Sequence, residues 1–233
     1  MPYAVIFIGP PGCGKDTQAN LLVDEYGFTA IPSSQIIRAK FAENLDDPII
    51  QEQKKLYDSG KLNSPKFVAS LIIEFVRPLA EAGKSIIFSG SPRVVDEAEG
   101  EIHQLSDWYG IENLIIIHFN LDEAEARRRA STRRLCRAQN HPFPNTPELE
   151  WMKTCPKDGS EIYVRELDNS EKYTIRLSEY RNLTEPCLEV FKKFGIAIHV
   201  IDASRSIEAI HHDIANLLDY QKDPIPSEIS GTI

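Results

Sequence analysis

The chain has 233 residues, of which 42% are hydrophobic and 26% charged, a composition typical of one globular domain or of a core with small inserts. Its formal net charge of -9 argues against non-specific nucleic-acid binding, which requires a basic face. We expect a cytoplasmic protein without membrane contact, because no apolar run approaches the roughly 18–20 residues of a bilayer span and no signal peptide is recognisable. The four cysteines are then expected to be reduced thiols, with Cys187 as a small core residue.

Short apolar runs alternate with helical patterns along most of the chain. Four runs predict strands that are buried on both faces: residues 3–8, 85–88, 114–119 and 197–201. Three stretches between and beside them predict helices: residues 15–26, 64–82 and 122–134. Strand and helix in alternation imply right-handed crossovers, so the predicted fold class is α/β, a three-layer sandwich with a mainly parallel sheet.

Two segments interrupt this alternation. Residues 35–61 are polar and helical in character and contain no apolar strand pattern, and residues 136–168 hold four prolines and many polar residues. Both are predicted to be inserts on the sheet core. Ligands of open parallel sheets bind at the carboxyl ends of the strands, where such inserts would cover them.

A glycine-rich segment, G-P-P-G-C-G-K over residues 9–15, follows the first predicted strand and precedes the first predicted helix. This is the G-x-x-x-x-G-K spacing of a phosphate-binding loop. Glycines let backbone N–H groups turn toward phosphates, the helix N-terminus adds partial positive charge, and Lys15 reaches the terminal phosphates. The alternative, a glycine-rich turn with a solvent-facing lysine, does not explain the flanking strand and helix. We therefore predict a nucleoside triphosphate site.

One position in this loop departs from the general pattern. The Ser or Thr that ligates magnesium after the lysine is replaced by Asp16, which is followed by Thr17. An acid beside a triphosphate repels it unless a cation lies between them. Asp16 or Thr17 is therefore the candidate magnesium ligand.

Residues 9–19, G-P-P-G-C-G-K-D-T-Q-A, resemble the opening of the adenylate kinase family within the nucleoside monophosphate kinases. The resemblance continues in order over nearly the whole chain. Residues 33–38 stand where the family has Ser/Thr-Gly-Asp-x-x-Arg, and residues 89–93 resemble its Asp-Gly-Phe-Pro-Arg. The remaining matches are Gly60-Lys61-Leu62 at the end of the monophosphate-binding insert, residues 129–134 entering the lid, and Arg165 and Arg176 leaving it.

The resemblance implies direct, in-line phosphoryl transfer from ATP to a nucleoside monophosphate, in a monomer that uses Mg²⁺. It implies a P-loop core of residues 1–32, 64–131 and 169–233, a helical monophosphate-binding insert of residues 33–63, and a lid of residues 132–168. The lid would close to exclude water, because an open site would hydrolyse the donor.

The resemblance also assigns roles to individual residues. Arg38 and Arg93 would hold the acceptor's phosphate, and Arg129 would stack on the donor base. Other arginines would surround the transferred group, whose transition state spreads negative charge over its oxygens. The implied catalytic residues are Lys15, Arg93, Arg133, Arg165 and Arg176. The implied ATP-binding residues are Gly12, Cys13, Gly14, Lys15, Asp16, Thr17, Arg129, Arg133 and Arg205. The implied monophosphate-binding residues are Ser33, Arg38, Lys61, Leu62, Asn63, Gly90, Arg93, Glu97, Arg165 and Arg176.

Two acids that the family places near the magnesium ion are absent, since Gln35 and Ser89 occupy their positions. One hypothesis is that Asp16 restores a metal-directed carboxylate from the phosphate loop. The alternative is that Asp16 only stabilises the start of the following helix, where acids are favoured. The absent acids also leave open a nucleotide-binding regulatory protein of the same fold with weak or no turnover. A kinase for a non-nucleotide acceptor would explain residues 9–17 but not the other matches.

Glu97 bears on which acceptor base is bound. It stands four residues after Arg93, where adenylate-specific family members carry Gln. An ionised carboxylate only accepts hydrogen bonds, so it would face the N1 lone pair of adenine unfavourably. Guanine instead offers N1–H and N2–H donors, which makes GMP a candidate acceptor beside AMP. The alternative is that Glu97 begins an acidic helix and points to water.

Many family members carry a zinc site in the lid, built from two short pairs of ligands. Cys136, Cys155 and Asp158 are present, but Gln139 stands where the remaining ligand is expected. His141 is close enough in sequence to take its place, which would give a Cys-His-Cys-Asp set that zinc accepts. The alternative is a relic site without metal, because the spacing is irregular and structural zinc requires four good ligands.

Overall fold

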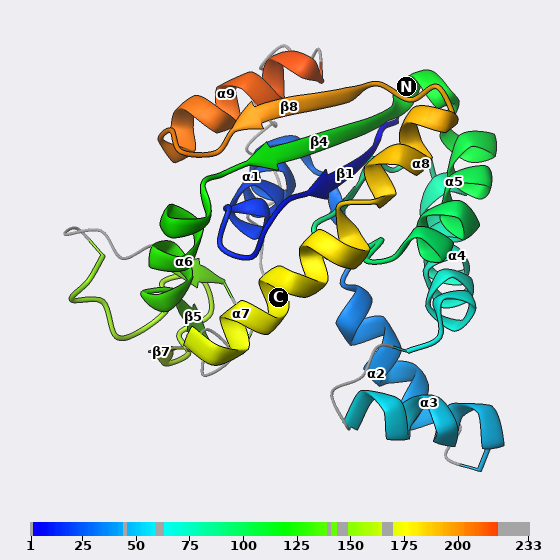
Figure 1. The fold of residues 1–233 in the computed structure, drawn as a ribbon, viewed down its shortest axis with the longest axis horizontal. Helices are drawn as coiled ribbons and strands as arrows, with labels where there is room; N and C mark the ends of the chain where they lie inside the picture. The colour runs from blue at the N-terminus through cyan, green and yellow to red at the C-terminus, as the bar shows by residue number, and fades with distance from the viewer. Residues whose placement is uncertain are drawn as a thin grey trace, which may run out of the picture.

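A computed structural model describes residues 2–43, 46–58, 63–138, 141–143, 149–164 and 170–218. Its centre is a parallel sheet of five strands in the order β2-β3-β1-β4-β8, with helices on both faces (Figure 1). The strands are β1 Ala4–Ile8, β2 Thr29–Ala30, β3 Ile86–Phe88, β4 Leu114–Asn120 and β8 Ile198–Asp202. The α/β prediction and the positions of the four predicted strands are confirmed, but β8 is not buried on both faces, since Val200 is 64% exposed. The two residues of β2 were too few to form a recognisable pattern.

β1 lies at the centre of the sheet because all five of its side chains are apolar and buried. Successive side chains of a strand point to opposite faces. Ala4, Ile6 and Ile8 accordingly join one hydrophobic cluster, and the two residues between them join the other. Ala4 pairs in register with the first residue of β3 and with the first residue of β4, so the three strands run together toward one edge of the sheet.

Helices cover the two faces of the sheet (Figure 1). α1 Lys15–Tyr26 and α9 Ile207–Leu217 pack on one face, and α4 Pro65–Glu81, α5 Val95–Tyr109 and α8 Cys187–Lys193 pack on the other. α1 has the predicted bounds and ends at Gly27, whose φ of 69° is the left-handed conformation that closes many helices. α4 begins where the Ser64 side chain accepts a hydrogen bond from the Phe67 amide.

The first insert contains α2 Ser33–Glu43 and α3 Pro48–Asp58, which project from the sheet core at the lower right of Figure 1. Its described residues form helices and no strand. Phe41 of α2 stacks on Phe67 of α4, with ring centroids 6.3 Å apart and an interplanar angle of 5°. An aromatic contact therefore anchors this insert to the core.

The second insert contains a small antiparallel sheet in the order β6-β5-β7. Its strands are β5 Arg134–Cys136, β6 Pro142–Phe143 and β7 Ile162–Val164, with α6 Glu123–Ser131 leading in and α7 Ser170–Glu179 leading out. The predicted helix over residues 122–134 was too long, since Arg134 begins β5. The Arg134 guanidinium donates hydrogen bonds to the Glu150 and Met152 carbonyls, at 2.9 and 3.0 Å. A contact distant in sequence thus overrides the local helical pattern.

α7 continues into η3 Tyr180–Thr184, a π-helical turn that leads to α8. Together they form the long helical path that crosses the front of the molecule in Figure 1. A short 3₁₀ helix, η1 Ile111–Asn113, precedes β4. Among the helices described, none is both long and apolar enough to cross a membrane.

Candidate active site

The phosphate loop leaves β1 after Ile8 and enters α1 at Lys15. Gly12 and Gly14 have φ values of 90° and 98°, a region that other residues rarely adopt. A Cβ atom on Gly12 would lie 2.6 Å from the carbonyl oxygen of Ala126 in α6, whereas one on Gly14 would meet nothing within 4 Å. Gly12 therefore permits close packing against α6, and Gly14 permits the turn into α1.

The loop brings two sources of positive charge together. Gly14 is the N-cap of α1 and has no side chain to cap the first turn, so the helix N-terminus is suited to an anion. The Lys15 ammonium group lies within the loop, where it donates hydrogen bonds to the carbonyls of Gly9 and Pro10, at 2.7 and 3.1 Å. It also lies 3.4 Å from the Cys13 sulfur, which belongs to a buried residue. This arrangement fits phosphate groups of a nucleotide.

Asp16 and Thr17 occupy the first turn of α1, directly after Lys15. Asp16 is exposed and Thr17 is half-buried. Within the described part of the chain, no hydrogen bond or ion pair engages the Asp16 carboxyl. Its position is compatible with both hypotheses, a metal-directed carboxylate and an acid that favours the helix start.

A second loop, residues 89–93, follows β3 and contains a cis peptide bond between Ser91 and Pro92. Arg93 is exposed. Its Nε atom donates to the Gly90 carbonyl at 2.9 Å, and its backbone N–H donates to the Glu97 carboxyl at 2.8 Å. Because β1 and β3 are adjacent and parallel, this loop and the phosphate loop follow strands that end at the same edge of the sheet.

Glu97 lies on the buried side of α5, with 4% of its surface exposed, so the interpretation that it points to water is wrong. Burial raises the pKa of Glu97, and hydrogen bonding to the Arg93 backbone and the Arg93 charge oppose that rise. A guanine edge would have to share this carboxyl with Arg93. Its role in reading the acceptor base stays a prediction.

The remaining residues predicted on the acceptor side lie around the first insert. Ser33 begins α2 and its hydroxyl is buried without a partner among the described residues. Arg38 is exposed on the same helix. The Asn63 amide is buried and donates to the Gln53 carbonyl at 2.7 Å, which fastens α3 to the start of α4. Lys61 and Leu62 lie outside the described residues.

Among the residues predicted to bind the donor, Arg129 of α6 reaches the loop after β8. Its Nε atom donates to Glu125 at 2.7 Å and its guanidinium also donates to the Ala203 carbonyl at 2.7 Å. Hydrogen bonds from Arg128 and Arg129 hold the pKa of Glu125 at about 2, well below its usual value. Arg205 follows in the same loop, and its guanidinium pairs with Asp213 on α9. Arg129 and Arg205, two of the three arginines predicted to bind ATP, therefore come from neighbouring segments.

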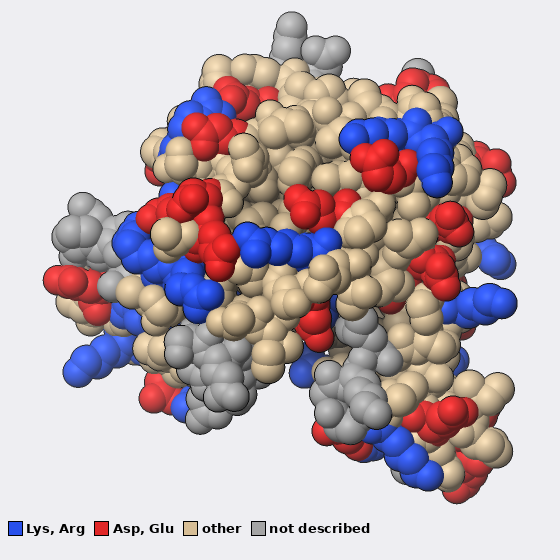
Figure 2. All heavy atoms as spheres, in the orientation of Figure 1, with Lys and Arg blue, Asp and Glu red and all other residues tan. Residues whose placement is uncertain are grey.

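The lid-side arginines lie on or next to α6 and α7. Arg133, between α6 and β5, and Arg176, on α7, are both half-buried. Arg165 lies outside the described residues. Figure 2 shows basic side chains gathered with acidic ones over α6, at the left of the view. Part of the chain's basic side chains thus lies over α6, next to the second insert.

α7 and η3 contact both loops, which sequence reasoning did not foresee. The Tyr173 hydroxyl of α7 donates to the Pro11 carbonyl of the phosphate loop at 3.2 Å. The Thr184 hydroxyl of η3 donates to the Arg93 carbonyl at 2.9 Å. The helical spacing of Tyr173, Arg176, Tyr180 and Thr184, three or four residues apart, was the available signal.

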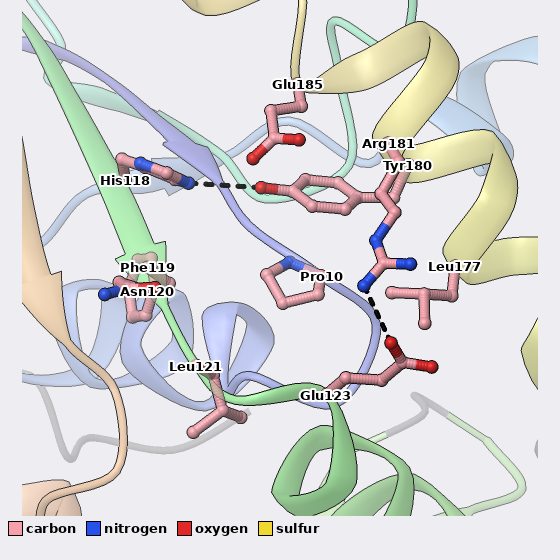
Figure 3. A pocket seen from close by; sticks show the side chains of 10 residues that line it. All are labelled: Pro10, His118, Phe119, Asn120, Leu121, Glu123, Leu177, Tyr180, Arg181 and Glu185. Carbon is pink, nitrogen blue, oxygen red and sulfur yellow. Dashed lines mark hydrogen bonds and ion pairs between the residues drawn. The ribbon is translucent and has the colours of Figure 1, made fainter.

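A cavity of about 140 Å³ adjoins the phosphate loop beneath α7 (Figure 3). Its lining residues are Pro10, His118, Phe119, Asn120, Leu121, Glu123, Leu177, Tyr180, Arg181 and Glu185. His118 Nε2 lies 3.1 Å from the Tyr180 hydroxyl, and Arg181 pairs with Glu123 at 2.7 Å. Burial lowers the pKa of His118, which favours the neutral ring. These contacts join β4 and α6 to the path through α7 and η3.

In the second insert, four side chains converge near the small sheet. One ligand atom each from Cys136, His141, Cys155 and Asp158 lies within 4.8 Å of the other three. His141 Nδ1 is 3.4 Å from both sulfur atoms and 3.2 Å from Asp158 Oδ2. Hydrogen bonds from Ser160 and then Cys136 lower the pKa of Asp158, and burial raises that of Cys155. Gln139 lies outside the described residues.

A phosphate loop, a neighbouring loop with an exposed arginine, and further arginines on the helices that flank the second insert are the arrangement of a P-loop phosphotransferase. Residues 7–196 match the sequence profile described as Adenylate kinase. The chain belongs to the adenylate kinase family and is a nucleoside monophosphate kinase of that type. The alternative of a regulatory protein without turnover is not favoured.

Individual members of this family align with the chain over nearly their whole length. The chain is 30% identical over 217 residues to the adenylate kinase of Carboxydothermus hydrogenoformans, covering 92% of this chain and 98% of the relative. It is 30% identical to the adenylate kinase of Chloroherpeton thalassium, covering 92% and 97%. It is 29% identical to that of Archaeoglobus fulgidus, again covering 92% and 97%.

Proposed function

We propose that the chain transfers the γ-phosphoryl group of ATP to AMP, with both nucleotides bound at the carboxyl edge of the parallel sheet. The observation that carries the proposal is the path through α7 and η3. It contacts the phosphate loop through Tyr173 and the loop of Arg93 through Thr184, and it presents Arg176 between these contacts. These contacts support a site in which the donor phosphates, the acceptor phosphate and Arg176 lie along one continuous helical segment.

The residue roles follow from charge and position. Lys15 and the start of α1 hold the β- and γ-phosphates of ATP, and Arg129 with Arg205 bounds the donor's base. Arg38 and Arg93 hold the phosphate of the acceptor. Arg133, Arg165 and Arg176 neutralise the oxygens of the transferred group as their charge redistributes in the transition state. Ser33, Lys61, Leu62, Asn63, Gly90 and Glu97 complete the acceptor side.

Magnesium is the cofactor that enzymes of this family use with their nucleotides. The carboxyl of Asp16 is exposed beside Lys15 and is not engaged by the described residues, so it fits a cation bound between the phosphates and α1. Gln35 and Ser89 supply neutral groups where carboxylates are usual. In this chain Asp16 therefore supplies the missing negative charge to the magnesium site.

The lid cluster is proposed to hold a zinc ion. Its atoms are two sulfurs, one imidazole nitrogen and one carboxylate oxygen, a chemically acceptable set. A tetrahedral zinc site with ordinary bond lengths has ligand–ligand distances of roughly 3.3–3.8 Å, and the cluster's contacts of 3.1–3.4 Å are close to that range. Such an ion would stabilise the lid and take no part in the transfer.

The activity is tested with ATP, Mg²⁺ and each of AMP, GMP, CMP and UMP, with diphosphate production as the readout. AMP is expected to be the best acceptor. Arg93→Lys, which keeps the charge but loses the planar fork, is expected to raise the KM for AMP by at least about tenfold and to leave the KM for ATP unchanged. A preference for GMP would support the hypothesis that Glu97 accepts hydrogen bonds from guanine. Absence of product with every monophosphate would refute the proposed activity.

Asp16 is tested by comparing Asp16→Asn with the wild type in magnesium titrations. If Asp16 faces the cation, the magnesium concentration for half-maximal rate rises by about tenfold and kcat falls. If the residue only favours the helix start, the loss is confined to about 0.3–1 kcal/mol of stability and the magnesium dependence is unchanged. Glu74→Gln, which neutralises an exposed acid on α4, is the control for loss of a surface charge.

A further inference from the structure

Two carboxyls lie buried on one face of α5, one helical turn apart. Glu97 has 4% and Glu101 has 1% of its surface exposed. Buried acids are rare unless they are paired with a base, and here the nearest partner of each is the loop of residues 89–93. Among the described residues, the burial of Glu101 is not explained by a hydrogen bond with the phosphate loop or with the second insert, since its hydrogen-bond partner is Ser91.

The two acids hold that loop on both sides of Pro92. The Ser91 hydroxyl, itself 2% exposed, donates to Glu101 Oε1 at 3.0 Å. The Arg93 backbone N–H donates to Glu97 Oε2 at 2.8 Å. Between them they fix the residue before Pro92 and the residue after it, so the direction in which the Arg93 side chain leaves the loop depends on both contacts.

The second oxygen of Glu101 is buried and has no partner among the described residues. A buried, unpaired carboxylate oxygen is strongly disfavoured, whereas a protonated carboxyl avoids the charge. Burial, with the neighbouring Glu97 adding to it, raises the pKa of Glu101 to about 8. The Ser91 bond opposes that rise.

The surroundings of Glu101 contain little that could offset its charge. On α5 itself, Glu97 is another acid. From α8, the Cys187 thiol faces the two acids, and its pKa of about 12 keeps it neutral. α4 packs here with apolar groups, since Ala69 lies against Gly100. The nearby positive charge is that of Arg93, which acts on Glu97.

We propose that neutral Glu101 is a positioning residue for acceptor binding, which holds Arg93 in its binding geometry through Ser91 and in concert with Glu97. The proposal deepens the proposed function, because it rests on Arg93 binding the phosphate of the monophosphate. The position of the loop therefore depends on whether Glu101 is protonated. Ionised Glu101 would place two negative charges a helical turn apart, and their repulsion would displace the loop.

The test uses calorimetric binding of AMP to the full chain between pH 6.5 and 9.5, which does not require turnover. If only neutral Glu101 holds the loop, the Kd for AMP rises about tenfold between pH 7 and pH 9, as expected for a group that titrates near 8. Glu101→Gln keeps an acceptor for Ser91 but cannot ionise, so its Kd is expected to stay flat over this range. The titration of AMP itself affects both proteins equally, so it cancels when the Kd of the variant is compared with the Kd of the wild type at each pH.

Ser91→Ala removes the hydrogen bond and keeps Glu101. It is expected to weaken AMP binding about fivefold at pH 7, the loss of one hydrogen bond, with the KM for ATP nearly unchanged. The thermal midpoint is expected to fall, because Glu101 Oε1 is left buried without its donor. If Ser91 acts through Arg93, the same substitution costs nothing further in an Arg93→Lys background. Circular dichroism shows that each variant is folded before it is compared.

Three outcomes would overturn the proposal: a Glu101→Gln profile that rises with pH as in the wild type, unchanged AMP binding in Ser91→Ala, or additive effects with Arg93→Lys. Binding without diphosphate production would refute the proposed activity while the calorimetric profiles still decide the role of Glu101. Binding of no monophosphate at all would refute both.

Discussion

At the scale of single residues, the phosphate loop depends on two glycines that are required for different reasons. Both have positive φ, but a Cβ atom on Gly12 would also meet the Ala126 carbonyl at 2.6 Å, whereas one on Gly14 would meet open space. The first contact lies against α6, which leads into the lid. A substitution at Gly14 therefore tests backbone strain alone, whereas one at Gly12 adds a steric clash with α6.

Gly14→Ala is expected to cost about 1–2 kcal/mol of unfolding free energy, because an L-residue in the left-handed region is strained by about that amount. Gly12→Ala is expected to cost at least about 1 kcal/mol more, since α6 must shift as well. Urea unfolding of both variants measures the difference. Equal losses would show that α6 yields to the added atom without penalty.

Glu101 gives the stability a distinct pH dependence. Its folded-state pKa, about 8, lies above the ordinary value of 4.5, so between these values the unfolded chain ionises while the folded chain stays neutral. Its contribution is therefore fully present below about pH 4.5 and is lost as the pH rises through 8. Glu101→Gln is expected to stabilise the fold relative to wild type by at most about 3.5 kcal/mol more at pH 8 than at pH 5. Thermal midpoints of both proteins at the two pH values measure this, and a constant difference would contradict it.

The sequence identified the residues whose spacing is fixed by chemistry and missed those fixed by packing. Lys15 and Arg93 belong to short segments in which neighbours carry the signal. Ser91 and Glu101 are ten residues apart, and only the fold of α5 under its preceding loop brings them together. Glu97 was noticed as a departure, but whether it faced water or protein depended on burial, which local sequence does not determine.

At the scale of elements, the path through α7 and η3 donates one hydrogen bond to the phosphate loop and one to the loop of residues 89–93. Tyr173→Phe removes the bond to Pro11 and Thr184→Val removes the bond to Arg93. Each is expected to cost about 1 kcal/mol, or about fivefold, in one substrate only: ATP for Tyr173→Phe and AMP for Thr184→Val.

Steady-state KM values for both substrates in both variants measure this cross-pattern. Ser178→Ala, on an exposed part of α7, serves as the control for a general loosening of the helix. If either variant weakened ATP and AMP equally, the path would act as one rigid support and not as two separate contacts.

Elements with a repeating pattern were predicted well, and elements defined by distant contacts were not. The bounds of α1 follow from its flanking glycines, which sequence shows directly. The end of α6 could not be seen, because Arg134 is drawn into β5 by carbonyls from residues 149–152. β2 is held by pairing with β3 and has no periodicity of its own.

At the scale of the whole molecule, the lid has a hydrophobic cluster separate from the two that enclose the sheet. It consists of Cys136, Phe143 and Cys155, with Met152 and Ile162 packed against it. So few apolar side chains do not stabilise a fold by themselves, and small units of this kind depend on a metal or a disulfide. Two members of the cluster are ligands of the proposed zinc site. The lid is therefore expected to lose its structure without metal while the core keeps its own.

The two tryptophans of the chain report on these parts separately, because Trp108 packs against the main core from α5 and Trp151 lies in the lid with 71% of its surface exposed. Purified protein is expected to contain about one zinc per chain. Trp108→Phe and Trp151→Phe each leave one tryptophan, so with selective excitation of tryptophan urea unfolding can be followed in either part with and without a chelator.

The chelator is expected to lower the anisotropy and the unfolding midpoint reported by Trp151, because the lid loses its metal-dependent structure. The midpoint reported by Trp108 should change little, since the sheet core does not depend on these ligands. Cys136→Ser should reproduce the effect of the chelator, whereas Cys187→Ala, which changes a buried thiol outside the cluster, should leave the metal content intact. Coincident midpoints for the two fluorophores under all conditions, in protein without bound zinc, would show that the four side chains form a packed relic and that the lid is stabilised by the core.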